Sequence, residues 1–261
     1  MIVDTHCHLH DAAFTDVRST LSRANDFDVW GVVAVGCDPT SNLRTLDAAM
    51  GHQKLVWPAL GFHPEWDQLT DADLEAVEAQ IVAHHAHIVA VGEVGLPWYA
   101  LGAATDAAAL ITQGRARLNR LLHLATRFDL PVILHAPHAA AAEAPDAVRA
   151  ASVERAVFHW HKGDPDVTDA IVDAGHFISV TPEVVYRDRD RELVERVPLD
   201  SLLVESDAPW PYQGEFENTP SGPWMAARVA EEVAKIKRLP AEETMYRLTV
   251  NACRLFHLVW A

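Results

Sequence analysis

The chain has 261 residues, 49% of them hydrophobic, which is enough for one large domain with a substantial core. Its formal net charge of −16, from 37 acidic and 21 basic residues, argues against a broad surface that follows nucleic-acid phosphates. Any role with nucleic acid therefore needs local charge neutralisation, which bound metal ions would supply.

The three cysteines Cys7, Cys37 and Cys253 are odd in number and far apart, which indicates free thiols in a reducing compartment. No segment resembles a signal peptide, and no stretch is long and charge-free enough to span a membrane. We therefore expect a cytoplasmic protein with no membrane partner and no obligate protein partner.

Short apolar runs of strand length recur along the chain, each followed by a longer segment with helical periodicity. The runs are rich in Val, Ile and Leu with little polar alternation, as is typical of strands buried on both faces. The expected strands are residues 2–7, 29–36, 55–62, 87–95, 131–136, 155–160, 176–181 and 202–207.

The clearest helical segments between these runs are residues 40–51, 71–85 and 106–128, and residues 240–261 are predicted to form two closing helices. About eight strand–helix units in a chain of this length predict a single (β/α)8 TIM barrel over residues 1–261. A doubly wound open sheet is the alternative. It usually has a Gly-rich phosphate turn after the first strand, where this chain reads "HCHLHDAAF".

Polar side chains fall at the ends of these expected strands. His6 and His8 are two residues apart on the first strand, so both imidazoles point to the same side. The carboxyl ends of all strands in such a barrel meet at one mouth, where chemistry takes place. The further residues expected there are His63, Glu93, His135, His159, Glu205 and Asp207.

Several imidazoles and carboxylates buried together without partners would be very costly, and a divalent metal removes that cost. This donor set suits Zn²⁺, Mn²⁺, Fe²⁺ or Co²⁺ better than Ca²⁺. The candidates outnumber the three or four ligands of one ion, which favours a pair about 3.5–4 Å apart with a carboxylate between them. Two divalent ions are therefore the expected cofactors, with Zn, Mn and Mg left open as the native metal.

Six motifs occur in an order that resembles the TatD-type metal-dependent hydrolases of the amidohydrolase superfamily. They are "DTHCHLH", "GFHPEW", "VGEVGL", "LPVILHAPH", "FHWHKG" and "LLVESDAPW". The resemblance covers essentially the whole chain. It implies a metal-dependent TIM-barrel hydrolase of phosphodiester bonds, typically in DNA.

The resemblance also implies roles for individual residues. One metal would be held by His6, His8, Glu93 and Asp207, and the second by Glu93, His135 and His159. Glu93 then bridges the ions, His63 contacts substrate, and Asp207 both binds metal and accepts the proton of the attacking water.

The chain departs from the family pattern in the residues around these ligands. Pro97 stands where the family usually has Asp, and Ala-Pro at 136–137 replaces Ser-Arg, so an arginine suited to binding phosphate is missing. His161 and Lys162 enter the sixth motif. We expect His138, His161 and Lys162 to replace the arginine as substrate contacts.

Other residues near the mouth have lesser expected roles. Glu205 is predicted to support a ligand histidine, Cys7 to lie in the core, and His10 to lie outside the ligand set. Four aromatic residues just beyond strand ends either pack at the mouth or form a stacking platform for a base: Trp98, Tyr99, Trp160 and Trp210.

The sequence thus predicts a metal-dependent phosphodiesterase or exonuclease-like deoxyribonuclease acting on single-stranded DNA or short oligonucleotides. A hydrolase of a small phosphoester or amide is the alternative, because the residues around the ligands have changed. A non-enzymatic metal-binding scaffold is a third hypothesis, which the complete ligand set disfavours.

Overall fold

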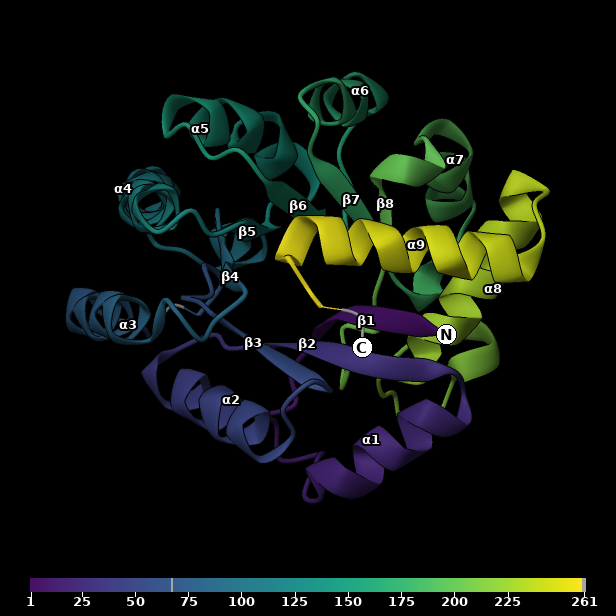
Figure 1. Cartoon of the computed structure of the whole chain (residues 1–261). Helices are drawn as coiled ribbons and strands as arrows, with labels where there is room; N and C mark the ends of the chain where they lie inside the picture. Colours follow the sequence, from purple (N-terminus) through teal and green to yellow (C-terminus); the bar gives the residue numbers. More distant parts are fainter. Residues whose placement is uncertain (67, 260–261) are drawn as a thin grey trace.

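The structure is a computed structural model that describes residues 1–66 and 68–259. Within these ranges, eight strands form one parallel sheet in which each strand pairs with the next along the chain (Figure 1). The strands are β1 Ile2–Cys7, β2 Val29–Val35, β3 Val56–Leu60, β4 Ala90–Gly95, β5 Val132–His135, β6 Ala156–His159, β7 Phe177–Val180 and β8 Leu202–Val204.

The sheet closes where the last strand meets the first. Cys7 forms a parallel bridge with Ala208, and the backbone N–H of His8 donates to the carbonyl of Ala208 at 2.9 Å. The hydroxyl of Thr5 donates to the carbonyl of Val204 at 3.0 Å. The predicted (β/α)8 barrel is therefore confirmed, and the open doubly wound sheet is excluded.

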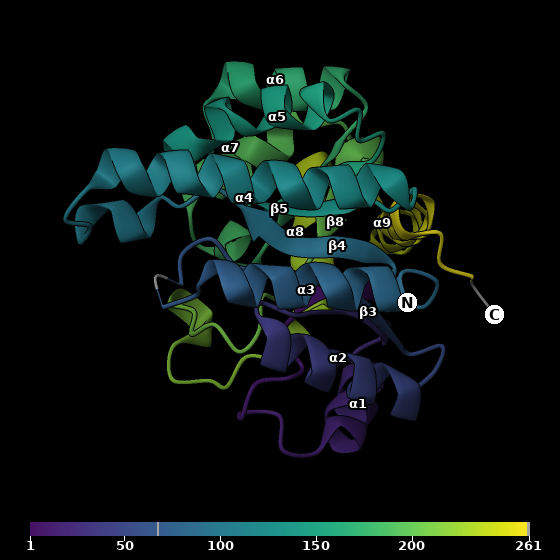
Figure 2. The same ribbon diagram turned by 90° about the vertical axis from the view of Figure 1, so that its left-hand side faces the viewer.

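Helices surround the strands on the outside of the barrel (Figures 1 and 2). Several begin where the sequence offers a capping side chain: Asp38 caps α2, and Thr70 caps α3. The helices are α1 Val17–Asp26, α2 Pro39–Gly51, α3 Asp71–His84, α4 Ala107–Arg127, α5 Ala144–Ala150, α6 Pro165–Asp173, α7 Asp188–Arg196, α8 Met225–Lys237 and α9 Ala241–Phe256.

The C-terminal segment forms one helix where two were predicted. Pro240 precedes α9, and no Gly or Pro interrupts the helix before Phe256. Helix α9 crosses the N-terminal end of the barrel (Figure 1), where Leu255 and Phe256 join a cluster of apolar side chains from the strands. Residues 260–261 of the predicted segment lie outside the described residues. Within the described chain, no helix combines the length and the apolar character that a membrane span requires.

Candidate metal centre

The carboxyl ends of five strands bring the predicted metal ligands into one buried cluster. The end of β1 and the residue after it supply two imidazoles, β4 the central carboxylate, β5 and β6 one imidazole each, and the turn after β8 a second carboxylate. The structure thus brings together His6, His8, Glu93, His135, His159 and Asp207.

One half of the cluster surrounds Oε2 of Glu93. His6 Nε2 lies 3.3 Å from that oxygen and 3.3 Å from His8 Nε2. His8 Nε2 lies 3.3 Å from Oδ1 of Asp207. Ligands bound tetrahedrally to one ion at 2.0–2.1 Å are about 3.4 Å apart, so these four side chains could hold one divalent ion.

The other half surrounds Oε1 of Glu93. His135 Nδ1 lies 2.7 Å from it, and His159 Nε2 lies 3.7 Å away. His63 Nε2 is also 3.4 Å from this oxygen, so His63 lies within the cluster itself. This half could hold a second ion, and the imidazole of His63 would lie next to that ion.

Glu93 is only 1% exposed, and its electrostatic surroundings suit a cation. Burial alone would raise the pKa of Glu93, but the surrounding imidazoles, led by His63 and His159, hold it well below its usual range. Among the residues that the structure describes, none makes a hydrogen bond to Oε2 of Glu93. A buried carboxylate oxygen without a hydrogen bond is unfavourable, and a bound metal ion would satisfy it.

Glu205 supports the ring of His159, in the role predicted for it. Its Oε1 lies 2.8 Å from His159 Nδ1 and accepts a hydrogen bond from the backbone N–H of Trp160 at 2.9 Å. This contact leaves Nε2 of His159 facing the cluster. Burial lowers the pKa of His159, but the carboxylates of Glu205, Glu93 and Asp207 outweigh burial and raise it to about 9.

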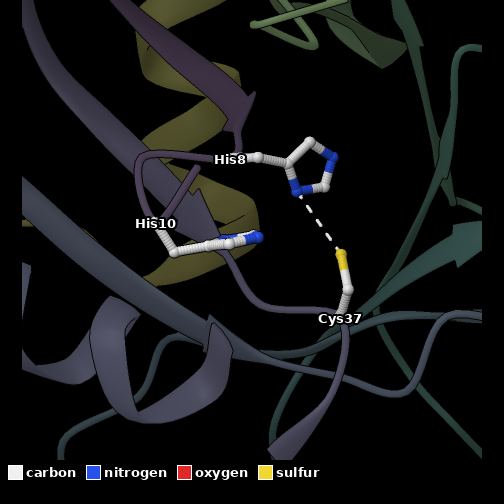
Figure 3. A group of neighbouring side chains, drawn as sticks. All are labelled: His8, His10 and Cys37. Atoms are coloured by element: carbon white, nitrogen blue, oxygen red, sulfur yellow. Dashed lines mark hydrogen bonds between the residues drawn. The ribbon is translucent and has the colours of Figure 1, made fainter. Parts of the chain in front are cut away.

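His8 is held from behind by the end of β2. Its Nδ1 lies 3.2 Å from the carbonyl oxygen of Val35 and 3.5 Å from Sγ of Cys37. Figure 3 shows the side chain of Cys37 pointing toward the ring of His8. Donation from Nδ1 to a carbonyl leaves Nε2 free for a metal. His10 lies beside His8 with ring centroids 5.4 Å apart. His10 and Cys37 therefore both contact the candidate ligand His8. The sequence did not predict this position for Cys37.

Asp4 ties the backbone of the first ligand strand to the turn after β8. Its carboxylate accepts from the backbone N–H of His6 at 3.2 Å and from the N–H and hydroxyl of Ser206 at 2.9 and 2.6 Å. Burial raises the pKa of Asp4 to about 8. His6 makes one of these bonds, and Asp207 directly follows Ser206, which makes the others. The bonds therefore fix the positions of His6 and Asp207 relative to each other.

Glu65 is a further acidic residue at the cluster that sequence reasoning missed. It follows β3 in "GFHPEW", and its Oε1 lies 3.1 Å from Nε2 of His135. The signal that could have identified it is an acidic residue directly after the His-Pro pair at a strand end.

A cavity of about 660 Å³ opens above the cluster, a size suited to a small-molecule ligand. Tyr99 and Trp210 are each 52% exposed, and both line it. Trp160 also lines the cavity, with its ring centroid 5.4 Å from that of Trp210. The mouth is therefore largely aromatic, whereas the floor is polar.

Of the three predicted substitutes for the missing arginine, Lys162 alone lines this cavity. Its Nζ lies 3.7 Å from the ring centroid of Trp160 and donates to the hydroxyl of Tyr99 at 3.4 Å. Burial lowers the pKa of Lys162 below its usual value.

The other two substitutes lie elsewhere. His138 packs against Trp98 and Tyr99, and its ring centroid lies 5.8 and 5.9 Å from theirs. His161 is 1% exposed, and its Nε2 bonds the hydroxyl of Thr168 at 2.9 Å. The position of His161 does not support the predicted substrate contact, because its ring faces α6 and not the cavity.

Comparison with known proteins identifies relatives along the full length of the chain. Residues 3–257 match the family described as TatD related DNase. The uncharacterized metal-dependent hydrolase YjjV of Escherichia coli is 31% identical and covers 98% of both chains. Human deoxyribonuclease TATDN3 is 29% identical and covers 98% of this chain and 94% of its own. The crystal structure of the E. coli TatD homologue YjjV superposes with a TM-score of 0.88 at 29% identity, over 99% of this chain and 98% of its own.

Proposed function

Because the chain belongs to the TatD related DNase family of metal-dependent hydrolases, we propose that it is a two-metal phosphodiesterase that shortens single-stranded DNA or short oligonucleotides. The observation that carries the proposal is the division of Glu93. One of its oxygens faces His6 and the other faces His135, so one carboxylate serves two groups of donors. DNA as the substrate draws support from the names of the family and of the human relative.

In this proposal each half of the cluster holds one divalent ion, of zinc, manganese or magnesium. Bound ions of this kind supply Lewis acidity to a phosphoryl oxygen and lower the pKa of a water molecule. The ligand set divides into His6, His8, Glu93 and Asp207 for the first ion, and Glu93, His135 and His159 for the second.

The side chains of the protein then carry out the remaining tasks. Asp207 accepts a proton from the attacking water, since it lines the cavity and its Oδ1 lies 3.3 Å from Nε2 of His8. His63 donates a hydrogen bond to a non-bridging oxygen or the leaving group from its place beside Glu93. Lys162 contacts the phosphate next to the reacting one, and Tyr99 and Trp210 receive a base by stacking.

A small phosphoester or an amide is the second candidate substrate. The observation in its favour is the composition of the mouth. Among the described residues that line the cavity, Lys162 is the one lysine or arginine, and it stands beside aromatic side chains. The net charge of −16 also disfavours long polyanions.

The test is hydrolysis of an end-labelled single-stranded oligonucleotide. Metal-stripped protein, protein resupplied with Mg²⁺, Mn²⁺ or Zn²⁺, and an Asp207→Asn variant are compared. We expect stepwise shortening that requires metal and is lost in the variant. Bound metal without shortening under any condition would contradict the DNA substrate and support the small phosphoester or amide.

A further inference from the structure

Glu65 stands between the candidate metal centre and the mouth of the cavity. It follows β3, and its carboxylate contacts one ligand histidine and the loop after β4. No role was predicted for it from the sequence. The contacts of its two oxygens indicate a specific function.

The first contact concerns the orientation of His135. Nδ1 of that ring faces Glu93 Oε1 at 2.7 Å, so Nε2 is the nitrogen left to face outward. Nε2 meets Oε1 of Glu65 at 3.1 Å. An imidazole that binds metal through Nδ1 carries its proton on Nε2. A carboxylate that accepts a hydrogen bond from this N–H fixes the tautomer and makes the ring a better ligand.

The second set of contacts concerns the backbone after β4. Oε1 of Glu65 accepts from the N–H of Trp98 at 2.7 Å and of Tyr99 at 3.2 Å, and Oε2 accepts from the N–H of Ala100 at 2.8 Å. Together with Nε2 of His135, these N–H groups give the carboxylate of Glu65 four hydrogen-bond donors.

Pro97 directly precedes the three residues whose N–H groups bind Glu65. Pro97 occupies the place where the resembled family usually has Asp, and proline offers neither a carboxylate nor an N–H. The carboxylate of Glu65 lies against the N–H groups of the next three residues. In this chain the loop after β3, and not the loop after β4, supplies an acidic group on this side of the pocket.

We infer that Glu65 is a positioning residue for the metal ion held by His135, and that it ties this ligand to the loop that carries Tyr99. The inference rests on the proposed two-metal centre. Glu65 acts through His135 and need not touch metal or substrate. Loss of the Glu65 carboxylate should therefore weaken binding of the ion at His135 and leave binding of the ion at His6 and His8 unchanged.

The experiment is calorimetric titration of the metal-free full chain with Mn²⁺, for the wild type, Glu65→Ala and Glu65→Gln. Removal of a carboxylate that supports a ligand histidine typically weakens metal binding about 10–100-fold. For Glu65→Ala we expect the Mn²⁺ affinity of this site to fall by a factor near the upper end of that range. For Glu65→Gln, which keeps an acceptor oxygen but loses the charge, we expect a factor near the lower end. The affinity of the other ion should stay unchanged.

Glu143→Gln is the matched control, because that glutamate pairs with Arg115 on the surface and its side chain is 46% exposed. Its two Mn²⁺ affinities should equal those of the wild type. Thermal unfolding verifies that each variant is folded. If Glu65→Ala does not fold, the Mn²⁺ affinities of Glu65→Gln, which preserves side-chain size, test the inference.

Two results would overturn the inference and are distinguishable. If the wild type binds two ions and folded Glu65 variants bind both as tightly, Glu65 only braces the loop, and the proposed function stands. If the wild type binds fewer than two ions, the two-metal centre of the proposed function fails, and the role of Glu65 fails with it.

Discussion

The two ends of this barrel are buried to a similar degree but filled with opposite chemistry. At the N-terminal end, which α9 crosses (Figure 1), Val3, Ile133 and Leu203 pack with Leu255 and Phe256 of that helix. Each of these side chains is at most 2% exposed. At the C-terminal end, His6 and Glu93 are just as buried, but they are surrounded by other imidazoles and carboxylates.

This difference separates stability from chemistry. Each apolar side chain buried at the N-terminal end stabilises the fold by about 1.5–3 kcal/mol relative to an exposed one. Charged and polar groups at the other end oppose folding unless a partner or a metal compensates them. Substitutions at the two ends should therefore have opposite signatures, as expected of a TIM barrel whose active site lies at the C-terminal face.

The largest effect is expected from Glu93→Gln. Loss of the carboxylate shared by both halves of the cluster should abolish binding of at least one ion and reduce kcat about 10³-fold or more. The thermal unfolding midpoint of the metal-free protein should also fall, because the buried imidazoles lose the carboxylate that compensates them. Metal analysis, rate measurements and thermal unfolding of the variant test this. Glu78→Gln on α3, in a surface pair with Arg120, is the control. A large loss of stability with the activity retained would contradict the separation.

The opposite signature is expected from Leu255→Ala on α9. Leu255 is fully buried, and truncation of such a side chain typically lowers the free energy of unfolding by about 2–5 kcal/mol. Metal stoichiometry and kcat should stay unchanged below the unfolding transition. Denaturant unfolding measures the first effect, and metal titration the second. Val259→Ala just beyond the helix, at an 81% exposed position, should change neither. Loss of metal from folded Leu255→Ala protein would show that the two ends are coupled.

A smaller effect is expected from acid. Neighbouring carboxylates outweigh burial and raise the pKa of His159 to about 9, so this ring is protonated below that pH when no metal is bound. Metal binding requires the neutral ring and must displace the proton, so affinity falls as pH falls. One competing proton lowers the affinity about tenfold per pH unit.

Calorimetry in buffers of different ionisation enthalpy measures this proton release directly. We expect release of at least one proton for the ion at His159 near pH 7.5. Binding without proton release, or with affinity independent of pH between 6.5 and 8.5, would contradict the assignment of His159.

The sequence predicted the eight strands well, because a buried parallel strand is a short apolar run that turn residues separate from its neighbours. It predicted the convergence of His6, Glu93 and His135 for a related reason. Closure of the barrel turns a regular spacing of strand ends along the chain into proximity in space.

The residues around the ligands could not be predicted in the same way. Glu65 and Cys37 lie in loops, and a loop's direction depends on backbone hydrogen bonds that no periodicity reveals. His161 was expected at the mouth because it is two residues beyond His159. Trp160 adopts a left-handed backbone with φ of 40°, which breaks the strand's alternation, and His161 is buried beside α6.

The smallest effect is expected from Lys162→Met at the rim of the cavity. Lys162 lines the cavity between Trp160 and the hydroxyl of Tyr99, and methionine keeps much of its apolar stem. Loss of a charge-assisted contact to a phosphate that is worth about 1.4 kcal/mol should raise the KM of the variant about tenfold. Its kcat and metal binding should be nearly unchanged. Steady-state kinetics with oligonucleotides of increasing length measures this effect. Lys54→Met, an exposed lysine before β3 at the N-terminal end, should have no effect on KM. If KM instead stays constant for Lys162→Met at every length, the aromatic side chains alone hold the substrate, and a small uncharged or planar group becomes the better candidate.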